Sequence, residues 1–395
     1  MIPSGAHAGT RGNGVRPHLV DALEQRHLPA LDGLRAVAVM TVIVYPFGYD
    51  RVPGDLGVTL FFVLSGFLIT WLLIAEHDAT QRISLRAFYL RRVLRIFPAY
   101  YVFICVSFVL DHLRGQHWPA GLLPSAIAYG VNYFNALHHH PDTSISHAWS
   151  LAVEEQFYLL WPLTFICLAR LGTRARRTVL VALVLLVAAW RSYLFLVRGV
   201  GPAYVYNAFD TRFDALGVGC LLAVLLHDET IARLASWLGR WSWQPLVTVT
   251  LLVWSRMGGS PGYHYALGFT VDALLFAILL IQVMCLSSSV SWRWLNHRVV
   301  RYVGRISYPM YLYHAWALEV GRHATQLPKI AQLGVGTLAT IAVASGSYFV
   351  IERPFLRMKA RFERNQNPTD LETDQPHQSG RIALGGVSQA VSRTL

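Results

Sequence analysis

The stretch GDLGVTLFFVLSGFLITWLL, residues Gly54 to Leu73, decides the fold. Asp55 is its single charged residue, and its length matches the roughly 20 residues that an α-helix needs to cross the hydrocarbon core of a bilayer. Ser65 and Gly66 lie in its middle, between bulky side chains. Small residues at such a place let a neighbouring helix or a thin ligand approach the backbone, and helix packing alone also accounts for them.

The rest of the chain has the same apolar character. Of its 395 residues, 54% are hydrophobic and 14% are charged, and the mean hydropathy is +0.39. Soluble domains carry about 25% charged residues, so this composition indicates an integral membrane protein in contact with lipid. The net charge of +12 comes from arginines between apolar stretches, which is typical of topology signals and argues against a nucleic-acid partner. We therefore predict an all-α, polytopic membrane helix bundle.

Ten apolar runs are long enough to cross a membrane when some tilt is allowed. They lie near residues 30–48, 56–76, 96–112, 149–169, 178–197, 210–227, 242–256, 264–286, 306–321 and 332–351. An eleventh run, 121–136, is shorter and contains Pro124 and Asn132. The arginine-rich loops all fall on one side if this run does not cross. We predict ten transmembrane helices, or eleven if 121–136 also crosses, and a long outer loop at 113–148 with an interfacial or re-entrant piece.

The membrane domain is predicted to cover residues 29–358. Residues 1–28 are polar and glycine-rich and lack the apolar stretch of a signal peptide. Residues 359–395 are mostly polar, without an apolar period. We expect both to be disordered cytoplasmic segments, which places the arginine-rich loops inside the cell. The oligomeric state is left open by the sequence.

Ionisable residues in or next to apolar runs are the first candidates for a functional site. Arg35 lies in the first run, where it either snorkels to lipid headgroups or partners an anion or polar group inside the bundle. Arg91, Arg92 and Arg95 follow the second run, with Arg86 about two helical turns earlier. Guanidinium groups pair bidentately with phosphate oxygens, so the cluster predicts a phosphate-bearing ligand. A patch for lipid headgroups and topology is the alternative.

The stretch HAWSLAVEEQFYLLWP places His147, Glu154 and Glu155 at the outer boundary of the apolar run at 149–169. Two adjacent carboxylates at the membrane boundary cost free energy unless they are paired with a cation or take part in the function. A partly buried glutamate near a histidine favours an acid–base pair. Ser150, four residues before Glu154, also resembles a helix start, which is the structural interpretation of that serine.

Three other features are weaker signals. Asp210, Arg212 and Asp214 lie at the outer start of a later run. His314 lies among tyrosines in GRISYPMYLYHAW, where a histidine is more often a satisfied packing residue than a functional one. The histidines at 138–140 lack matching ligands elsewhere, so no metal site is predicted.

Six stretches, in this order, together resemble one family. They read LDGLRAVAV, GVTLFFVLSGFLIT, RRVLRIFPAYY, HAWSLAVEEQFYLLWP, RISYPMYLYH and IERPF. The chain thereby resembles the acyltransferase family 3 proteins over about residues 29–358. The resemblance implies a bundle of ten or eleven helices. It also implies a membrane O-acyltransferase that modifies sugars of bacterial polysaccharides, lipopolysaccharide, glycolipids or secondary metabolites.

The resemblance also implies roles for single residues. Arg35 matches the start of a motif with an Arg or Lys, ten residues and then a His taken as catalytic. The position of that His is occupied by Pro46. Arg92 and Arg95 match an arginine pair associated with acyl-coenzyme A, and acetyl-CoA is the expected donor. The acceptor is expected to be a glycan or glycolipid at the bacterial cytoplasmic membrane.

These implied roles suggest a geometry. The helix from Arg35 to position 46 rises about 16 Å at 1.5 Å per residue. Coenzyme A would bind the cytoplasmic arginines, and its pantetheine arm would pass between helices. The thioester would then reach an outer sugar hydroxyl near Glu154 and Glu155. Direct transfer and a covalent acyl-enzyme both remain open.

Pro46 has no side-chain proton acceptor, so it cannot act as the base. One interpretation is a member that folds but transfers poorly, because loss of a general base costs about 10²–10⁴-fold. It predicts that Pro46→His raises transfer strongly. A second is that His147, His314 or Glu155 supplies the base. A third is that the protein only binds or translocates.

Two non-enzymatic functions are alternatives. Ten spans with intramembrane charges also suit a transporter, although no second copy of the first-half motifs is visible, as many transporters have. A membrane sensor or scaffold whose basic loop binds anionic lipid is the other alternative. It predicts no acyl-CoA binding and no loss of function in Arg92→Ala.

Overall fold

The computed structural model describes residues 29–45, 54–324 and 326–358, and all regular secondary structure within these ranges is helical. The longer helices are α2 (Pro29–Val44), α3 (Gly54–Thr80), α4 (Leu85–Leu113), α7 (Trp149–Ala169), α8 (Thr173–Ser192), α10 (Phe209–His227), α12 (Gln244–Gly258), α14 (Phe269–Leu286), α16 (Ser307–His323) and α17 (Lys329–Ser347). Short helices connect them: α5 (Leu122–Ile127), α6 (Val131–Leu137), α9 (Pro202–Asn207), α11 (Ala232–Leu238), α13 (Pro261–Tyr263) and α15 (Arg298–Arg305). Single 3₁₀ or π turns complete the chain: η2 (Ser146–Ala148), η3 (Tyr193–Val197), η4 (His264–Gly268), η5 (Arg293–Asn296) and η6 (Tyr348–Glu352).

Six helices of the described chain, taken with the turns that extend them, are long and apolar enough to cross a membrane. They are Gly54–Thr80, Leu85–Leu113, Ser146–Ala169, Thr173–Val197, Pro261–Leu286 and Lys329–Met358. A seventh span would join Pro202–His227 to Ala232–Leu238, two segments bent by 108°. Each of the ten predicted runs is helical over most of its described residues, which confirms the all-α polytopic bundle. Because α2, α12 and α16 have only 16, 15 and 17 residues, the count of ten stays a prediction.

The segment 121–136 forms two short helices instead of one. α5 has six residues and α6 has seven, so neither is long enough to cross a bilayer. They lie beside the long helix α4, and the Tyr100 hydroxyl donates a hydrogen bond to the Ala126 carbonyl oxygen at 2.8 Å. As predicted, 121–136 does not cross as a single helix. The termini predicted to be disordered, 1–28 and 359–395, lie outside the described residues.

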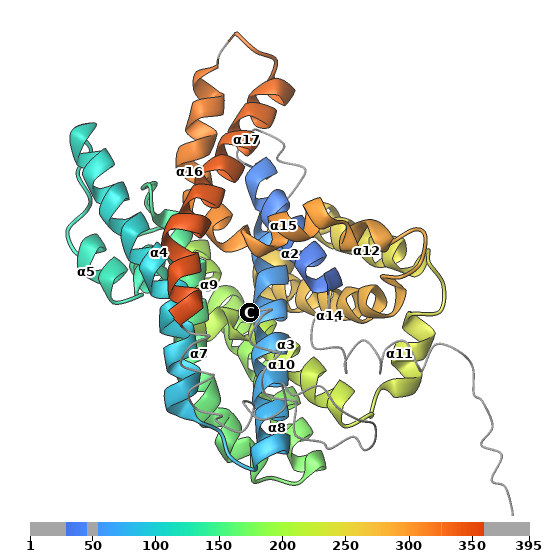
Figure 1. The fold of residues 1–395 in the computed structure, drawn as a ribbon. Coiled ribbons are helices and arrows are strands. Elements are labelled where there is room, and N and C mark those ends of the chain that lie inside the picture. The colour runs from blue at the N-terminus through green and yellow to red at the C-terminus, as the bar shows by residue number, and fades with distance from the viewer. Residues whose placement is uncertain (1–28, 46–53, 325, 359–395) are drawn as a thin grey trace, which may run out of the picture.

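Helix α3 runs through the middle of the bundle and packs closely against α10 (Figure 1). A Cβ atom added to Gly66 would collide with the carbonyl of Leu216 on α10, and one added to Gly219 would collide with the carbonyl of Val63 on α3. Each glycine therefore lets the two backbones touch. The predicted role of Gly66 in close helix packing is confirmed, and the neighbouring Ser65 is left to face a cavity.

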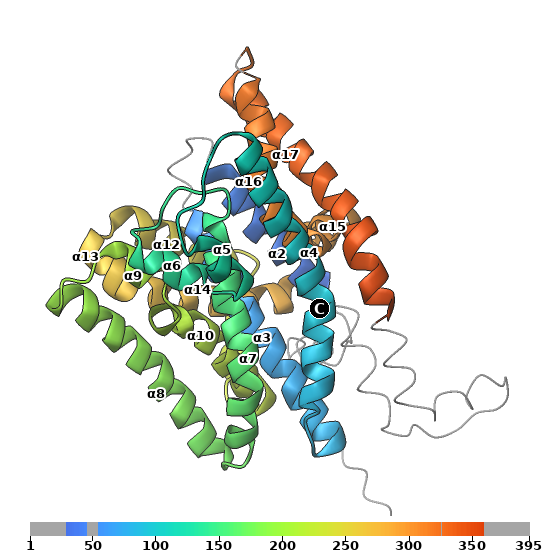
Figure 2. The ribbon, with the colours of Figure 1, turned by 90° about the vertical axis from the view of Figure 1, so that its left-hand side faces the viewer.

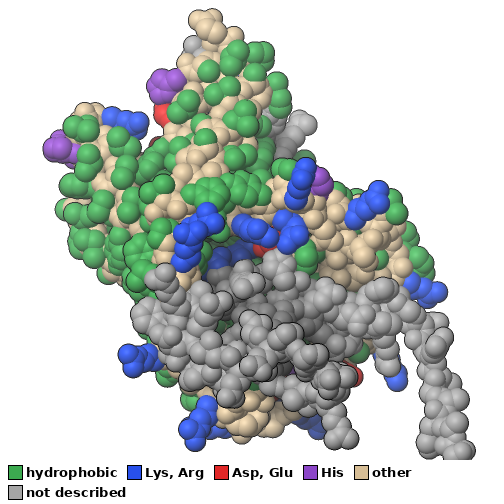
Figure 3. All heavy atoms as spheres, in the orientation of Figure 1, with side chains coloured by type: hydrophobic (Ala, Val, Ile, Leu, Met, Phe, Trp, Pro, Cys, Tyr) green, Lys and Arg blue, Asp and Glu red, His purple; other side chains and the backbone are tan. Residues whose placement is uncertain are grey.

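The outer surface of the bundle is apolar, as expected for contact with lipid acyl chains. Large hydrophobic side chains such as Leu113, Leu185 and Val350 are exposed on α4, α8 and η6. Figure 3 shows hydrophobic side chains over much of α16 and α17, and Lys and Arg side chains gathered near α15. Figures 1 and 2 show α16 and α17 packed side by side in an arm that extends beyond the other helices.

A buried ion pair joins α8, α10 and α14. Arg191 and Asp214 are both fully buried, and Arg191 Nη1 lies 2.7 Å from Asp214 Oδ2. Arg191 Nη2 also donates to Thr270 Oγ1 at 2.6 Å, and Arg191 Nε donates to the Ala266 carbonyl oxygen at 3.1 Å. Charges far from water need such pairing, so this network fixes how three helices meet. Asp214, predicted at an outer helix start, is thus a structural residue.

Candidate active site

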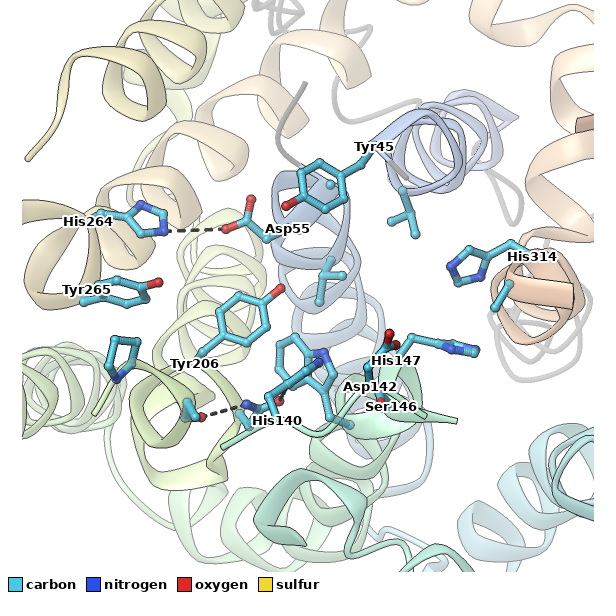
Figure 4. Close-up of a pocket in the computed structure, with 18 of the residues that line it drawn as sticks. Tyr45, Asp55, His140, Asp142, Ser146, His147, Tyr206, His264, Tyr265 and His314 are labelled. Carbon is cyan, nitrogen blue, oxygen red and sulfur yellow. Dashed lines mark hydrogen bonds and ion pairs between the residues drawn. The ribbon is translucent and has the colours of Figure 1, made fainter. Parts of the chain in front are cut away.

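A cavity of about 1160 Å³, here the large cavity, lies where the ends of α2, α3, α12 and α16 meet the loop before α7 (Figure 4). Its polar lining includes Asp55, His139, His140, Asp142, Thr143, Ser146, His147, Asn207, Arg256, His264, His314 and Arg322. Its aromatic lining consists of Tyr45, Trp149, Tyr206, Tyr265 and Tyr311. Aromatic faces beside hydrogen-bonding groups are suited to a sugar, whose two faces are apolar and whose edges are hydroxyls.

One wall of the large cavity carries a charged network that the sequence analysis missed. Arg256, at the end of α12, forms ion pairs with Asp55 at the start of α3 and, at 2.8 Å, with Asp272 on α14. His264 Nε2 lies 3.7 Å from Asp55 Oδ2 (Figure 4). Ser255 donates to Asp272 at 3.0 Å. Asp272 lies inside an apolar run, and that intramembrane carboxylate was the available sequence signal.

Two histidines lie together on the opposite wall. The His147 and His314 rings are edge to face, with centroids 4.7 Å apart. His147 Nε2 lies 3.1 Å from the Leu312 carbonyl oxygen, and His314 Nδ1 lies 2.6 Å from the Tyr311 carbonyl oxygen. The structure thus brings the predicted site residue His147 to the large cavity, next to a histidine that the pattern had favoured as packing.

His140 lies in the loop at the bottom of Figure 4 and forms a hydrogen bond with a residue of α9. Its Nδ1 lies 3.0 Å from Asn207 Oδ1. Burial lowers the pKa of the His140 imidazole below its ordinary value, and the hydrogen bond with Asn207 acts in the opposite direction. The net result is a His140 ring that is mainly neutral at pH 7.

A second cavity of about 50 Å³, here the small cavity, contains three of the predicted site residues. Arg35, Ser65 and Glu154 line it, together with Ser150 and Tyr308. Glu154 Oε1 accepts a hydrogen bond from Ser65 Oγ at 2.8 Å, and the Tyr158 hydroxyl donates to Ser65 Oγ at 3.1 Å. Glu154 therefore does not line the large cavity as its predicted place at the outer opening required. Glu154 follows His147 by about two helical turns, which places it beside Arg35 and mid-α3.

Val58 and Tyr311 line both cavities, so these two side chains separate them. The Tyr311 hydroxyl lies 2.6 Å from Ser150 Oγ and donates to the His147 carbonyl oxygen at 2.9 Å. Ser150 had been interpreted as a helix cap, but the N-cap of α7 is Ala148 and Ser150 lies inside the helix. Its hydroxyl instead holds the aromatic side chain that divides the two cavities.

The arginines of the predicted cluster on α4 differ in their burial and in their charged partners. Arg91 forms an ion pair with Glu76 at 3.2 Å, so its charge is balanced within the protein. Arg92 is 8% exposed and lies over the rings of Phe88 and Tyr158, at 5.6 and 5.1 Å from their centroids. Within the described ranges, Arg92 has no hydrogen bond or close ion pair. It interacts with Glu155 only at longer range.

Arg92, Arg95 and Arg35 form one electrostatic group near the small cavity. Arg95 interacts with Arg35, Arg92 and Glu352, and Glu154 interacts with Arg35 and Arg92. Three guanidinium groups thus share three nearby carboxylates, Glu154, Glu155 and Glu352. Arg92, which has no close ion pair among the described residues, is the member of this group best placed to pair with an anionic ligand.

Pro46 lies outside the described residues. Tyr45 and Gly54, the described residues on either side of that gap, both line the large cavity. Among the residues that the structure describes, no group of three or more His, Cys, Asp and Glu side chains could hold a metal ion.

A family model described as an acyltransferase domain matches residues 28–349 of this chain. The putative peptidoglycan O-acetyltransferase YrhL of Bacillus subtilis is 30% identical over 349 residues, which are 83% of this chain and 55% of that protein. Peptidoglycan O-acetyltransferase OatA of Listeria monocytogenes is 30% identical over 352 residues, 84% of this chain and 56% of that protein.

A third relative is the O-acetyltransferase OatA of Staphylococcus aureus, 33% identical over 356 residues, which are 83% of this chain and 57% of that protein. The chain spans about half the length of the curated relatives it matches. No solved structure shows a significant match to it. With the family match over most of its length and its long apolar helices, the chain is a multi-pass membrane protein that belongs to the acyltransferase domain family.

Proposed function

We propose that this protein is a membrane O-acetyltransferase that moves an acetyl group from cytoplasmic acetyl-CoA to a hydroxyl of a cell-wall glycan of the peptidoglycan type. The observation that carries the proposal is the pair of adjoining cavities, which share Val58 and Tyr311 in their linings. A cationic group lies at the small cavity and a sugar-sized space on the other side. Such an arrangement lets a donor and an acceptor meet from two sides of a membrane.

The arginines support an acyl-CoA donor. Coenzyme A carries several phosphate charges, and Arg92 is a buried guanidinium without an ion pair among the described residues. A guanidinium fork pairs well with phosphate oxygens, and Arg35 and Arg95 add to the local positive charge. The small cavity, at about 50 Å³, would then hold no more than the acyl end of the thioester, which favours acetyl as the group transferred.

The lining of the large cavity supports a glycan acceptor. Its volume of about 1160 Å³ exceeds what a single acetyl group needs. Tyr206, Tyr265 and Trp149 offer aromatic faces, and Asp55, Asn207 and Asp142 offer hydrogen-bond acceptors. The similarity to a peptidoglycan O-acetyltransferase and to a putative one supports a polysaccharide acceptor. A glycolipid acceptor is the second member of the same class.

The proposed reaction requires three events. The acceptor oxygen bonds to the thioester carbonyl carbon, the C–S bond breaks, and the hydroxyl proton goes to a base. Hydrogen-bond donors stabilise the developing oxyanion. Transfer can be direct or pass through an acyl-enzyme. Because Pro46 cannot act as a base, a chain in which no other residue takes that role would carry out the same steps slowly.

The proposed location is the bacterial cytoplasmic membrane, with both termini inside. The basic loops support this orientation: Arg91, Arg92 and Arg176 would then face the cytoplasm, as the positive-inside rule requires. The large cavity, built from the opposite helix ends, would open outward.

The test uses the full chain in vesicles with its cytoplasmic face outward. Labelled acetyl-CoA is added outside, and soluble peptidoglycan glycan strands are enclosed inside. We expect label on the enclosed glycan and free coenzyme A outside, with no label in vesicles without protein. Unmodified solute that crosses without acyl transfer would instead indicate a transporter. Neither transfer nor acetyl-CoA binding would indicate a sensor or scaffold.

A further inference from the structure

His314 differs from the other ionisable groups of the large cavity in its orientation. It lies on α16, is 5% exposed, and Figure 4 shows its ring pointing from that helix toward the cavity. The neighbouring His147 ring points the other way, beneath His314 and toward α16. Among the described residues, His314 is therefore the imidazole best placed to meet a ligand from the side of Tyr45.

Its hydrogen bond fixes which nitrogen carries the lone pair. A carbonyl oxygen accepts hydrogen bonds and cannot donate them, so His314 Nδ1, 2.6 Å from the Tyr311 carbonyl oxygen, must carry the proton. The neutral ring then has its lone pair on Nε2, the nitrogen farther from the backbone. A histidine held in this tautomer is ready to accept a proton at a defined atom.

The surrounding side chains hold the His314 ring in place. His147 packs against one face at 4.7 Å between ring centroids, and its own Nε2 is directed to the Leu312 carbonyl oxygen at 3.1 Å. The Tyr311 ring lies 5.6 Å from the His314 ring. Because Tyr311 also lines the small cavity, His314 lies next to the side chain that divides donor from acceptor.

Three other ionisable groups that line the two cavities are already engaged by neighbouring side chains. Glu154 accepts a hydrogen bond from Ser65 and lines the small cavity only. His264 lies against Arg256, and its Nε2 lies 3.7 Å from Asp55 Oδ2. His140 is bonded to Asn207. None of the three combines a free lone pair with a position beside Tyr311.

We propose that His314 is the general base of this chain and takes, at Nε2, the proton that related sequences are expected to place on the histidine at position 46. The inference rests on the proposed transferase function. As the acceptor oxygen bonds to the thioester carbonyl carbon, its proton moves to His314 Nε2. The C–S bond breaks with its electron pair on sulfur, and the imidazolium then returns the proton to the departing thiolate. His147 is a positioning residue that fixes the ring.

The test measures transfer of labelled acetyl from acetyl-CoA to glycan strands by the full chain in vesicles. His314→Gly should lower the transfer rate about 10²–10⁴-fold, because a general base contributes that factor. Binding of acetyl-CoA should not change. Added imidazole should restore a substantial part of the rate in His314→Gly, since it fits the space left by the ring. The matched control, His323→Gln, alters an exposed histidine on the same helix and should behave as the parent does.

A second arm uses Pro46→His. If His314 is the base, Pro46→His alone should leave the rate near that of the parent, and in the His314→Gly background it should raise it. A parent that transfers no acetyl at all contradicts the proposed function. A parent that transfers acetyl, together with an unaffected His314→Gly variant or one that imidazole does not rescue, contradicts the role of His314. A large gain from Pro46→His alone contradicts that role as well.

Discussion

Replacing Arg92 by alanine is expected to weaken acetyl-CoA binding by about 10- to 150-fold, which corresponds to the roughly 1.5–3 kcal/mol of a hydrogen bond to a charged group. Arg92 is 8% exposed and rests on Phe88 and Tyr158, so its guanidinium is already oriented before the ligand arrives. Arg91 cannot substitute, because Glu76 balances its charge at 3.2 Å.

Equilibrium binding of acetyl-CoA to the purified full chain measures the effect. Arg92→Lys should fall between the parent and alanine, since lysine keeps the charge but loses the planar fork. Arg170→Ala, at the exposed end of α7, is the control and should bind as the parent does. Unchanged affinity in Arg92→Ala would show that the α4 arginines serve lipid contact or topology instead.

Replacing Asp214 by alanine is expected to destabilise the fold by about 3–5 kcal/mol. The change leaves the fully buried Arg191 without its carboxylate, and an unpaired buried charge is far costlier than the loss of a surface pair. The expected observation is a marked drop in the thermal unfolding midpoint, measured in one detergent for all variants.

Two comparisons separate this cause from a general loss of packing. Glu319→Gln breaks the exposed pair with Arg322, where about 0–1 kcal/mol is expected. The double variant Arg191→Leu with Asp214→Leu removes both charges and should be more stable than Asp214→Ala. If the double variant were no better than the single one, the uncompensated charge would not be the reason for the loss.

The sequence predicted which segments are helical better than it predicted which residues meet. Long apolar runs can hardly be anything else, because a bilayer leaves backbone groups no partner except within a helix. The same property removes the orientation signal: a helix such as α3 is apolar all around, so periodicity does not say which face turns inward. Composition alone does not decide the count of spans, because α2, α12 and α16 are short for a membrane crossing.

Only some of the predicted site residues lie together in the structure. Arg35, Ser65 and Glu154 do line one cavity, although Glu154 was expected at the outer opening beside His147. The expectation treated His147 and Glu154 as sharing one environment, whereas about two helical turns separate them and they line different cavities. The Asp55, Arg256 and Asp272 network joins three helices distant in sequence, and the intramembrane carboxylate of Asp272 signals only one of its members.

The thin partition formed by Val58 and Tyr311 has a consequence for the cell. A passage left open there would dissipate the gradients that drive ATP synthesis. The hydroxyl contact between Tyr311 and Ser150 at 2.6 Å would therefore act as an electrical seal as well as a divider, and widening it should make the vesicles leaky.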